Sequence, residues 1–151
     1  MNPRPTTPIN PQQSFELKLL TLRILWFALF MSIVLYYGLT FFVGPREETE
    51  PNPMLSMILI VIALSTTVVS FLVKSKLLSR AIEQQNVQLV QQAYIVALAL
   101  CETSALLGLL DYFATGHPHY YIPFIIGALG QLLHFPRRDH VVNASSKTPI
   151  I

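Results

Sequence analysis

The sequence predicts an all-α integral membrane protein, a bundle of four transmembrane helices with both termini in the cytoplasm. Three observations support this fold class. Of 151 residues, 52% are hydrophobic and only 12% are charged, whereas roughly a quarter of the residues in soluble domains are charged. Four apolar stretches follow one another along the chain, and nine of the ten basic residues fall on one side of a four-pass arrangement. The composition therefore argues against a soluble enzyme and for a chain surrounded mainly by lipid.

The first two apolar stretches are long enough to cross a bilayer. A spanning helix needs about 20 apolar residues, because each residue adds ~1.5 Å across a hydrocarbon core of ~30 Å. Residues 24–43 and 54–73 are each 20 residues long and contain no charged side chain. We therefore expect spanning helices over about 20–43 and 54–76. The first run ends without the small-residue cleavage site of a secretory signal, so we expect an uncleaved anchor.

The third and fourth apolar stretches are less regular. Residues 90–114 are interrupted by two carboxylates, and residues 120–135 form a run of only 16. We expect helices over about 89–114 and 120–135. The fourth stretch could instead be a re-entrant or interfacial segment. A spanning helix is favoured because it places Arg137 and Arg138 on the same side as the other basic residues.

The basic residues predict the orientation of the chain. They precede the first predicted helix, lie between the second and third, or follow the fourth: Arg4, Lys18, Arg23, Lys74, Lys76, Arg80, Arg137, Arg138 and Lys147. Only Arg46 lies in the opposite loops, where three glutamates surround it. By the positive-inside rule the more basic side is cytoplasmic. A bacterial-type cytoplasmic membrane is the default location.

The segments outside the four stretches are expected to be short turns or tails. Residues 1–15 are predicted to be a disordered tail, because four prolines within residues 1–13 oppose a helix. Residues 16–138 form the predicted membrane domain, and residues 139–151 a flexible tail. Between the second and third stretches there is no glycine or proline over residues 77–92. We therefore expect these two helices to extend and to meet in a short turn near Asn86.

Glu102 carries the most chemical information in the sequence. It lies near the middle of the third predicted helix, where a charge costs on the order of 3 kcal/mol. A carboxyl that stays protonated avoids much of this cost, and it can donate one hydrogen bond and accept another. The fourth helix runs antiparallel to the third, so Gln131 and His134 can continue a polar line from Glu102 towards the cytoplasm. Asp111 lies near the outer interface, where we expect it to be solvated.

Several interpretations of these polar residues remain open. Glu102 can serve as an interhelical hydrogen-bonding group, as a proton or ion site, or as a recognition group for another membrane subunit. His134 can be a headgroup-level residue or a proton relay. The residues assigned to a candidate ion or proton site are Glu102, Gln131 and His134.

Small residues form a stripe along the third predicted helix. Such stripes allow helices to approach closely in lipid. The predicted packing residues are Ala97, Cys101, Ser104, Ala105 and Gly108 on the third helix, with Gly127 and Gly130 on the fourth. Because Glu102 borders this stripe, we expect its side chain to face protein and not lipid.

Residues 99–109, which read ALCETSALLGL, resemble the carboxylate helix of the proteolipid (c-type) subunits of rotary ATPases. In that family a mid-membrane Glu or Asp takes up and releases the transported ion. The resemblance covers about eleven residues and implies such a role for Glu102 alone. The second predicted helix lacks the glycine repeat of the family's inner helix. The turn at residues 83–86 reads EQQN, where the family has an Arg-Gln/Asn-Pro signature.

Catalytic and cofactor motifs are absent from the sequence. There is no Ser/His/Asp set, no Gly-rich phosphate loop and only one cysteine, and two nearby histidines, His117 and His119, are weak evidence for a metal site. The net charge of +2 does not indicate a nucleic-acid partner. We expect no enzyme activity, cofactor or metal. The predicted function is that of an accessory, scaffold or assembly component, which packs against other membrane proteins or in a homo-oligomer. The alternative is a proton or cation pathway centred on Glu102.

Overall fold

The computed structural model describes residues 11–44 and 52–145, which form five helices and no strand. They are α1 (Pro11–Phe42), α2 (Pro53–Glu83), α3 (Val87–Thr115), α4 (Tyr121–Leu133) and α5 (Arg138–Ser145). The first three are long and apolar enough to cross a membrane, while α4 is a shorter apolar helix. The prediction of an all-helical chain with apolar helices of membrane length is confirmed for these residues.

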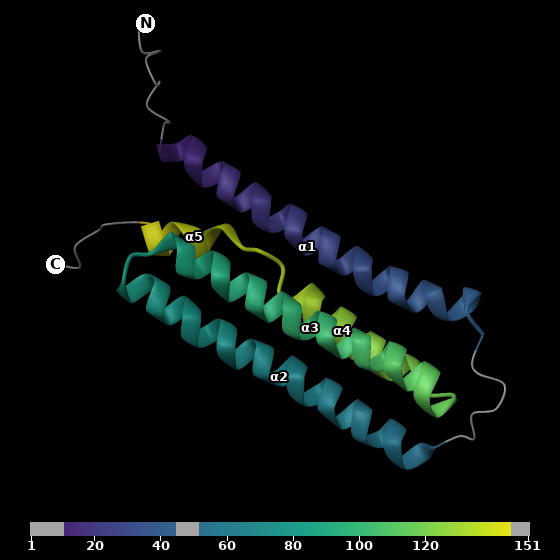
Figure 1. Cartoon of the computed structure of the whole chain (residues 1–151). Coiled ribbons are helices and arrows are strands. Elements are labelled where there is room, and N and C mark those ends of the chain that lie inside the picture. Colours follow the sequence, from purple (N-terminus) through teal and green to yellow (C-terminus); the bar gives the residue numbers. More distant parts are fainter. Residues whose placement is uncertain (1–10, 45–51, 146–151) are drawn as a thin grey trace, which may run out of the picture.

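The helices are arranged around α3. It contacts each of the other four, and Figure 1 shows α2 and α4 running antiparallel to it. After α4 the chain returns to the end of the molecule where α2 meets α3, and α5 lies at that end (Figure 1). The described chain therefore travels the length of the molecule four times, although only three of its helices have membrane length.

Local hydrogen bonds explain where α2 and α3 begin and end. The side chain of Asn52 accepts a hydrogen bond from the amide of Leu55 at 3.1 Å, and a proline follows Asn52 at the first helical position. Asn86 accepts in the same way from the amide of Gln88 at 2.9 Å. The turn near Asn86 lies where the sequence predicts it. At the far end, Gly116 adopts a left-handed backbone conformation with φ 56° and ends α3.

The short α4 differs from the predicted helix over 120–135. It has 13 residues, or about 20 Å at ~1.5 Å per residue, which is less than a ~30 Å hydrocarbon core. His134 ends α4, and a proline at position 136 has no amide hydrogen to continue it. Residues 134–137 carry the chain the rest of the way to α5.

The predicted tails are partly helical. α1 begins at Pro11, so residues 11–15 are helical where a disordered tail was expected; proline is tolerated in the first turn, where its missing amide costs nothing. α5 replaces the predicted flexible tail over residues 139–145. The remaining parts of these predictions, residues 1–10 and 146–151, lie outside the described residues, as does the loop 45–51.

Two apolar clusters hold the molecule together. One lies at the end that contains the α2–α3 turn and joins all the helices except α4: Leu19, Leu22, Ala81, Val90, Tyr94, Val141 and Ala144. The other lies between α1, α3 and α4: Ile33, Ala105 and Phe124. The first cluster explains why residues near 141 are helical, since Val141 and Ala144 are almost completely buried by it.

Candidate functional site

Glu102 lies in α3 and contacts α1. Ser32 Oγ is 2.6 Å, and Tyr36 Oη 3.0 Å, from the same carboxyl oxygen, Oε1. Ser32 and Tyr36 are four residues apart and therefore share one face of α1. All three side chains are partly buried. The carboxyl group thus joins the middle of α3 to the middle of α1.

The hydrogen bonds of Ser32 indicate which form of Glu102 satisfies this cluster. Ser32 Oγ is also 2.7 Å from the carbonyl oxygen of Leu29, and a hydroxyl group has only one hydrogen to donate. A protonated carboxyl can donate to Ser32 Oγ, which leaves the Ser32 hydrogen for Leu29. A neutral Glu102 therefore satisfies both contacts, and Tyr36 donates to the same carboxyl oxygen.

The predicted line from Glu102 through Gln131 to His134 is divided among different helix pairs. Gln131 is paired with Trp26 of α1: the Trp26 indole donates to the Gln131 carbonyl at 2.7 Å, and Gln131 Nε2 donates to the Trp26 carbonyl at 3.3 Å. His134 Nε2 lies 3.2 Å from Ser70 Oγ on α2. Glu102 instead contacts Ser32 and Tyr36, which lie more than one helical turn beyond Trp26 along α1.

A row of hydroxyl groups leads along the α2–α3 interface towards His134. Ser104 Oγ lies 2.8 Å from Thr67 Oγ1, and Ser70 donates to the Thr67 carbonyl at 2.6 Å and contacts His134. Within the described residues, Gln131 Oε1 and His134 Nδ1 are buried and have no hydrogen-bond partner. Such buried acceptors cost about 1–3 kcal/mol each, so this region of the core is polar at a cost in stability.

Asp111 differs from its expected solvated position. It is fully buried, and its two carboxyl oxygens accept from Ser56 of α2 at 2.8 Å and from Thr115 at 2.6 Å. The expectation rested on the position of Asp111 near a helix end. No sequence pattern points to Ser56, which lies 55 positions away and reaches Asp111 only because α2 and α3 pair as a hairpin.

The predicted packing residues are buried between α3 and its neighbours. The α3 stripe, consisting of Ala97, Cys101, Ser104, Ala105 and Gly108, is buried, as are Gly127 and Gly130 of α4. A Cβ atom added at Gly127 would lie 2.7 Å from the Cys101 carbonyl oxygen, and one at Gly108 would lie 2.7 Å from the Phe124 ring. The stripe of α3 is therefore covered by α4 and, at Ser104, by α2 of the same chain.

A second polar cluster lies at the end with the α2–α3 turn, and no sequence motif predicts it. Tyr94 Oη is 2.6 Å from His140 Nδ1 and accepts from the backbone amide of Arg137 at 3.1 Å. The Lys74 ammonium lies 4.3 Å from the centre of the Tyr94 ring. Burial lowers the pKa of His140, and the charges of Lys74 and Arg137 lower it further, while Asp139 acts in the opposite direction.

The histidines at the opposite end form a small exposed pair. His117 Nδ1 and His119 Nδ1 are 3.3 Å apart. Across residues 11–44 and 52–145 there is no group of three or more His, Cys, Asp or Glu side chains arranged to hold a metal ion.

Comparison with known proteins found no matching family model, no matching curated protein and no matching solved structure.

Proposed function

We propose that this chain is an integral membrane protein of the cell membrane that crosses the bilayer four times, with both termini in the cytoplasm. Three apolar helices of membrane length support the membrane location. The fourth crossing would consist of α4 together with residues 134–137. The described basic residues at the ends of α1, α2 and α4 favour a cytoplasmic location for that side: Lys18, Arg23, Lys74, Lys76, Arg80, Arg137 and Arg138.

Within this arrangement, the proposed role is that of an accessory, scaffold or assembly component that acts through helix packing and catalyses no reaction. One observation carries this proposal: the polar side chains of the core connect one helix to another. Glu102 joins α3 to α1, and Asp111 joins α3 to α2. Ser104 contacts Thr67 across the same α2–α3 interface. These bonds fix the positions of the helices relative to one another.

The proposed partner, a second copy or another membrane protein, would use a face other than the small-residue stripe, because α2 and α4 cover that stripe. α1 is the least buried of the three long helices. Its most apolar stretch of 18 residues is only 17% buried, compared with 28% for α2 and 44% for α3. Leu35 and Phe27 on this helix are 71% and 57% exposed. α1 is therefore the helix that we propose contacts other membrane proteins.

A photo-reactive amino acid in place of Leu35 tests this role in native membranes. The proposal predicts one discrete protein adduct, whose mass distinguishes a second copy from another protein. The matched control replaces Met57, which is 69% exposed on α2, and should give lipid adducts only. Lipid adducts at both positions would contradict the proposed role of α1.

A proton or cation pathway is the second candidate, and the half-buried carboxyl of Glu102 favours it. The resemblance to rotary ATPase proteolipids suggests the same residue. Glu102 contacts the Tyr36 hydroxyl at 3.0 Å, and the row of hydroxyl groups that ends at His134 lies on the other side of α3. Movement of an ion would require Glu102 to gain and lose its proton.

Proton flux into reconstituted vesicles distinguishes the two candidates. The packing role predicts that wild-type protein and Glu102→Gln both conduct no more than protein-free vesicles. It also predicts that Glu102→Gln stays folded, because an amide nitrogen in the place of Oε1 has two hydrogens and can donate to both the Ser32 and the Tyr36 hydroxyl oxygens. A wild-type flux that disappears in Glu102→Gln would overturn the packing role and establish the carboxyl as a transport site.

A further inference from the structure

Apolar residues on the outer face of α1 repeat with the spacing of a coiled-coil seam. They recur at alternating intervals of three and four residues from position 17 to position 41, which are the a and d positions of a heptad. None of them is buried. We call them the α1 seam: Leu17, Leu20, Ile24, Phe27, Met31, Val34, Gly38 and Phe41.

The cytoplasmic end of the α1 seam needs a cover other than lipid. In the proposed membrane arrangement the charge-free run of α1 begins at residue 24. Leu17 precedes that run by ~10 Å, at ~1.5 Å per residue, which places it outside the hydrocarbon core. Leu17 and Leu20 are nevertheless 56% and 53% exposed. Large apolar side chains exposed beside water indicate that a protein covers this part of α1.

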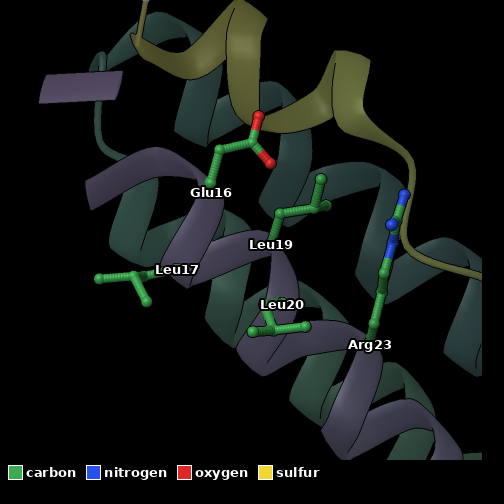
Figure 2. Close-up of a pocket in the computed structure, with 5 residues that line it drawn as sticks. All are labelled: Glu16, Leu17, Leu19, Leu20 and Arg23. Carbon is green, nitrogen blue, oxygen red and sulfur yellow. The ribbon is translucent and has the colours of Figure 1, made fainter. Parts of the chain in front are cut away.

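A groove lies beside these two leucines. It has a volume of about 270 Å³ and is lined by Glu16, Leu17, Leu19, Leu20 and Arg23. Figure 2 shows Leu17 pointing away from the other helices, while Glu16 points towards α5. In a coiled coil each seam side chain fits into a depression between side chains of the facing helix. The groove provides such a depression at the cytoplasmic end of the α1 seam.

From the seam and its groove we infer that two copies of this chain pair through α1, as parallel helices in register. The inference rests on the proposed function and deepens it, because it selects a second copy as the partner of α1. Both copies enter the membrane in the same orientation, so both carry the seam at the same depth. Each seam residue then faces its counterpart across a two-fold axis. The spacing of the seam predicts a left-handed pair.

The charged side chains beside the seam do not oppose this pairing. Glu16 and Arg23 occupy g positions of successive heptads, and in a parallel pair a g residue faces an e residue of the other helix. The e residues that they face are Thr21 and Ala28 of the second copy, so neither charge meets a like charge. Both side chains also contact their own chain. Glu16 pairs with Arg138 at 3.5 Å, and the Arg23 guanidinium carbon lies 6.0 Å from the centre of the Phe135 ring.

Disulfide crosslinking in isolated native membranes tests this pairing. Cys101→Ala removes the only cysteine of the chain, and single cysteines then replace seam residues at the two ends, Leu20→Cys and Phe41→Cys. The matched controls are Lys18→Cys and Leu39→Cys, which are exposed and lie at nearly the same depth but occupy position b, on the flank of the helix. A copper–phenanthroline oxidant joins two thiols that lie close together.

The inference predicts that Leu20→Cys and Phe41→Cys both give mainly a covalent dimer, of twice the chain mass of 17.0 kDa. Lys18→Cys and Leu39→Cys should remain monomeric. Equal dimer formation at the seam and flank positions would indicate random collision and would overturn the pairing. Dimers at only one end of the seam, or at neither end, would overturn it as well.

The photo-reactive residue at position 35 distinguishes failure of this inference from failure of the proposed role of α1. Leu35 occupies an e position beside the seam. An adduct with another protein, together with no covalent dimer from Leu20→Cys, would overturn the second copy and retain the contact role of α1. Lipid adducts alone, together with no covalent dimer, would overturn both.

Discussion

For Glu102, the sequence predicts the position in the membrane helix but not the residues that hydrogen-bond to its carboxyl group. The sequence places a carboxyl in the middle of an apolar helix, and this predicts a group that needs hydrogen bonds. It does not predict that those bonds go to Ser32 and Tyr36, because the pairing depends on how α1 is rotated against α3. Asp111 shows the same limit more strongly, since its burial depends on the α2–α3 hairpin bringing Ser56 to it.

Gly127 gives a prediction at the residue scale. A methyl group there would lie 2.7 Å from the Cys101 carbonyl oxygen and 3.2 Å from the Ala105 amide nitrogen, and backbone atoms of α3 cannot move aside easily. Overpacking typically destabilises the fold by about 1–3 kcal/mol. The higher helix propensity of alanine than of glycine offsets up to about 1 kcal/mol of this. Gly127→Ala should therefore lower the free energy of unfolding by about 1–2 kcal/mol, measured by Trp26 fluorescence in mixed micelles.

Gly38→Ala is the matched control, because a Cβ atom at Gly38 has no neighbour within 4 Å. It should leave the free energy of unfolding unchanged or raise it by up to about 1 kcal/mol. Equal free energies of unfolding for Gly127→Ala and Gly38→Ala would contradict the close packing of α4 against α3 at Gly127.

At the scale of elements, the long helices follow from composition, while the short ones depend on tertiary contacts. Apolar runs of 20 residues predict α1 and α2 without further information. α5 has 8 residues and a polar composition, so its sequence alone favours a flexible tail. It is helical where Val141 and Ala144 pack against Leu19 and Leu22, and these contacts form only once α1 and α5 lie side by side.

The contact between Tyr94 and His140 makes the docking of α5 dependent on pH. The Tyr94 hydroxyl accepts from the Arg137 amide and donates to neutral His140. Protonation of His140 would remove Nδ1 as an acceptor for the Tyr94 hydroxyl. It would also add a positive charge beside Lys74 and Arg137, which the negative charge of Asp139 offsets only in part. The lowered pKa of His140 means that the docked state binds fewer protons than the undocked state. Docking is therefore strongest above pH 6.5, the ordinary value for histidine, and weakens as the pH falls below it.

Energy transfer from Trp26 to a dye on Asn143→Cys, in a Cys101→Ala background, measures this docking. Asn143 lies on α5 and is exposed. Transfer should decrease reversibly as the pH falls below 6.5. The decrease should persist in His119→Gln, which changes an exposed histidine, and disappear in His140→Gln. A decrease that survives in His140→Gln would assign the pH dependence to another group.

At the scale of the whole molecule, the distribution of charge and the path of the chain favour the same four-pass arrangement. The seven basic residues of the described ranges gather at the end where α1 begins, α2 meets α3, and α5 lies (Figure 1). The path from α4 to α5 leads back to this end, even though α4 alone has only 13 residues. The sequence predicts the number of traverses from hydropathy and charge. It does not predict that the last traverse is a short helix followed by a non-helical segment.

Side-specific labelling tests the proposed four-pass arrangement most directly. Single cysteines are introduced by His119→Cys, Asn143→Cys and Ser79→Cys in a Cys101→Ala background, and intact cells are treated with a membrane-impermeant maleimide. All three positions are exposed. The arrangement predicts that His119→Cys is labelled in intact cells, whereas Asn143→Cys and Ser79→Cys are labelled only after permeabilisation. Labelling of both His119→Cys and Asn143→Cys in intact cells would show that the segment from α4 to α5 does not cross the membrane.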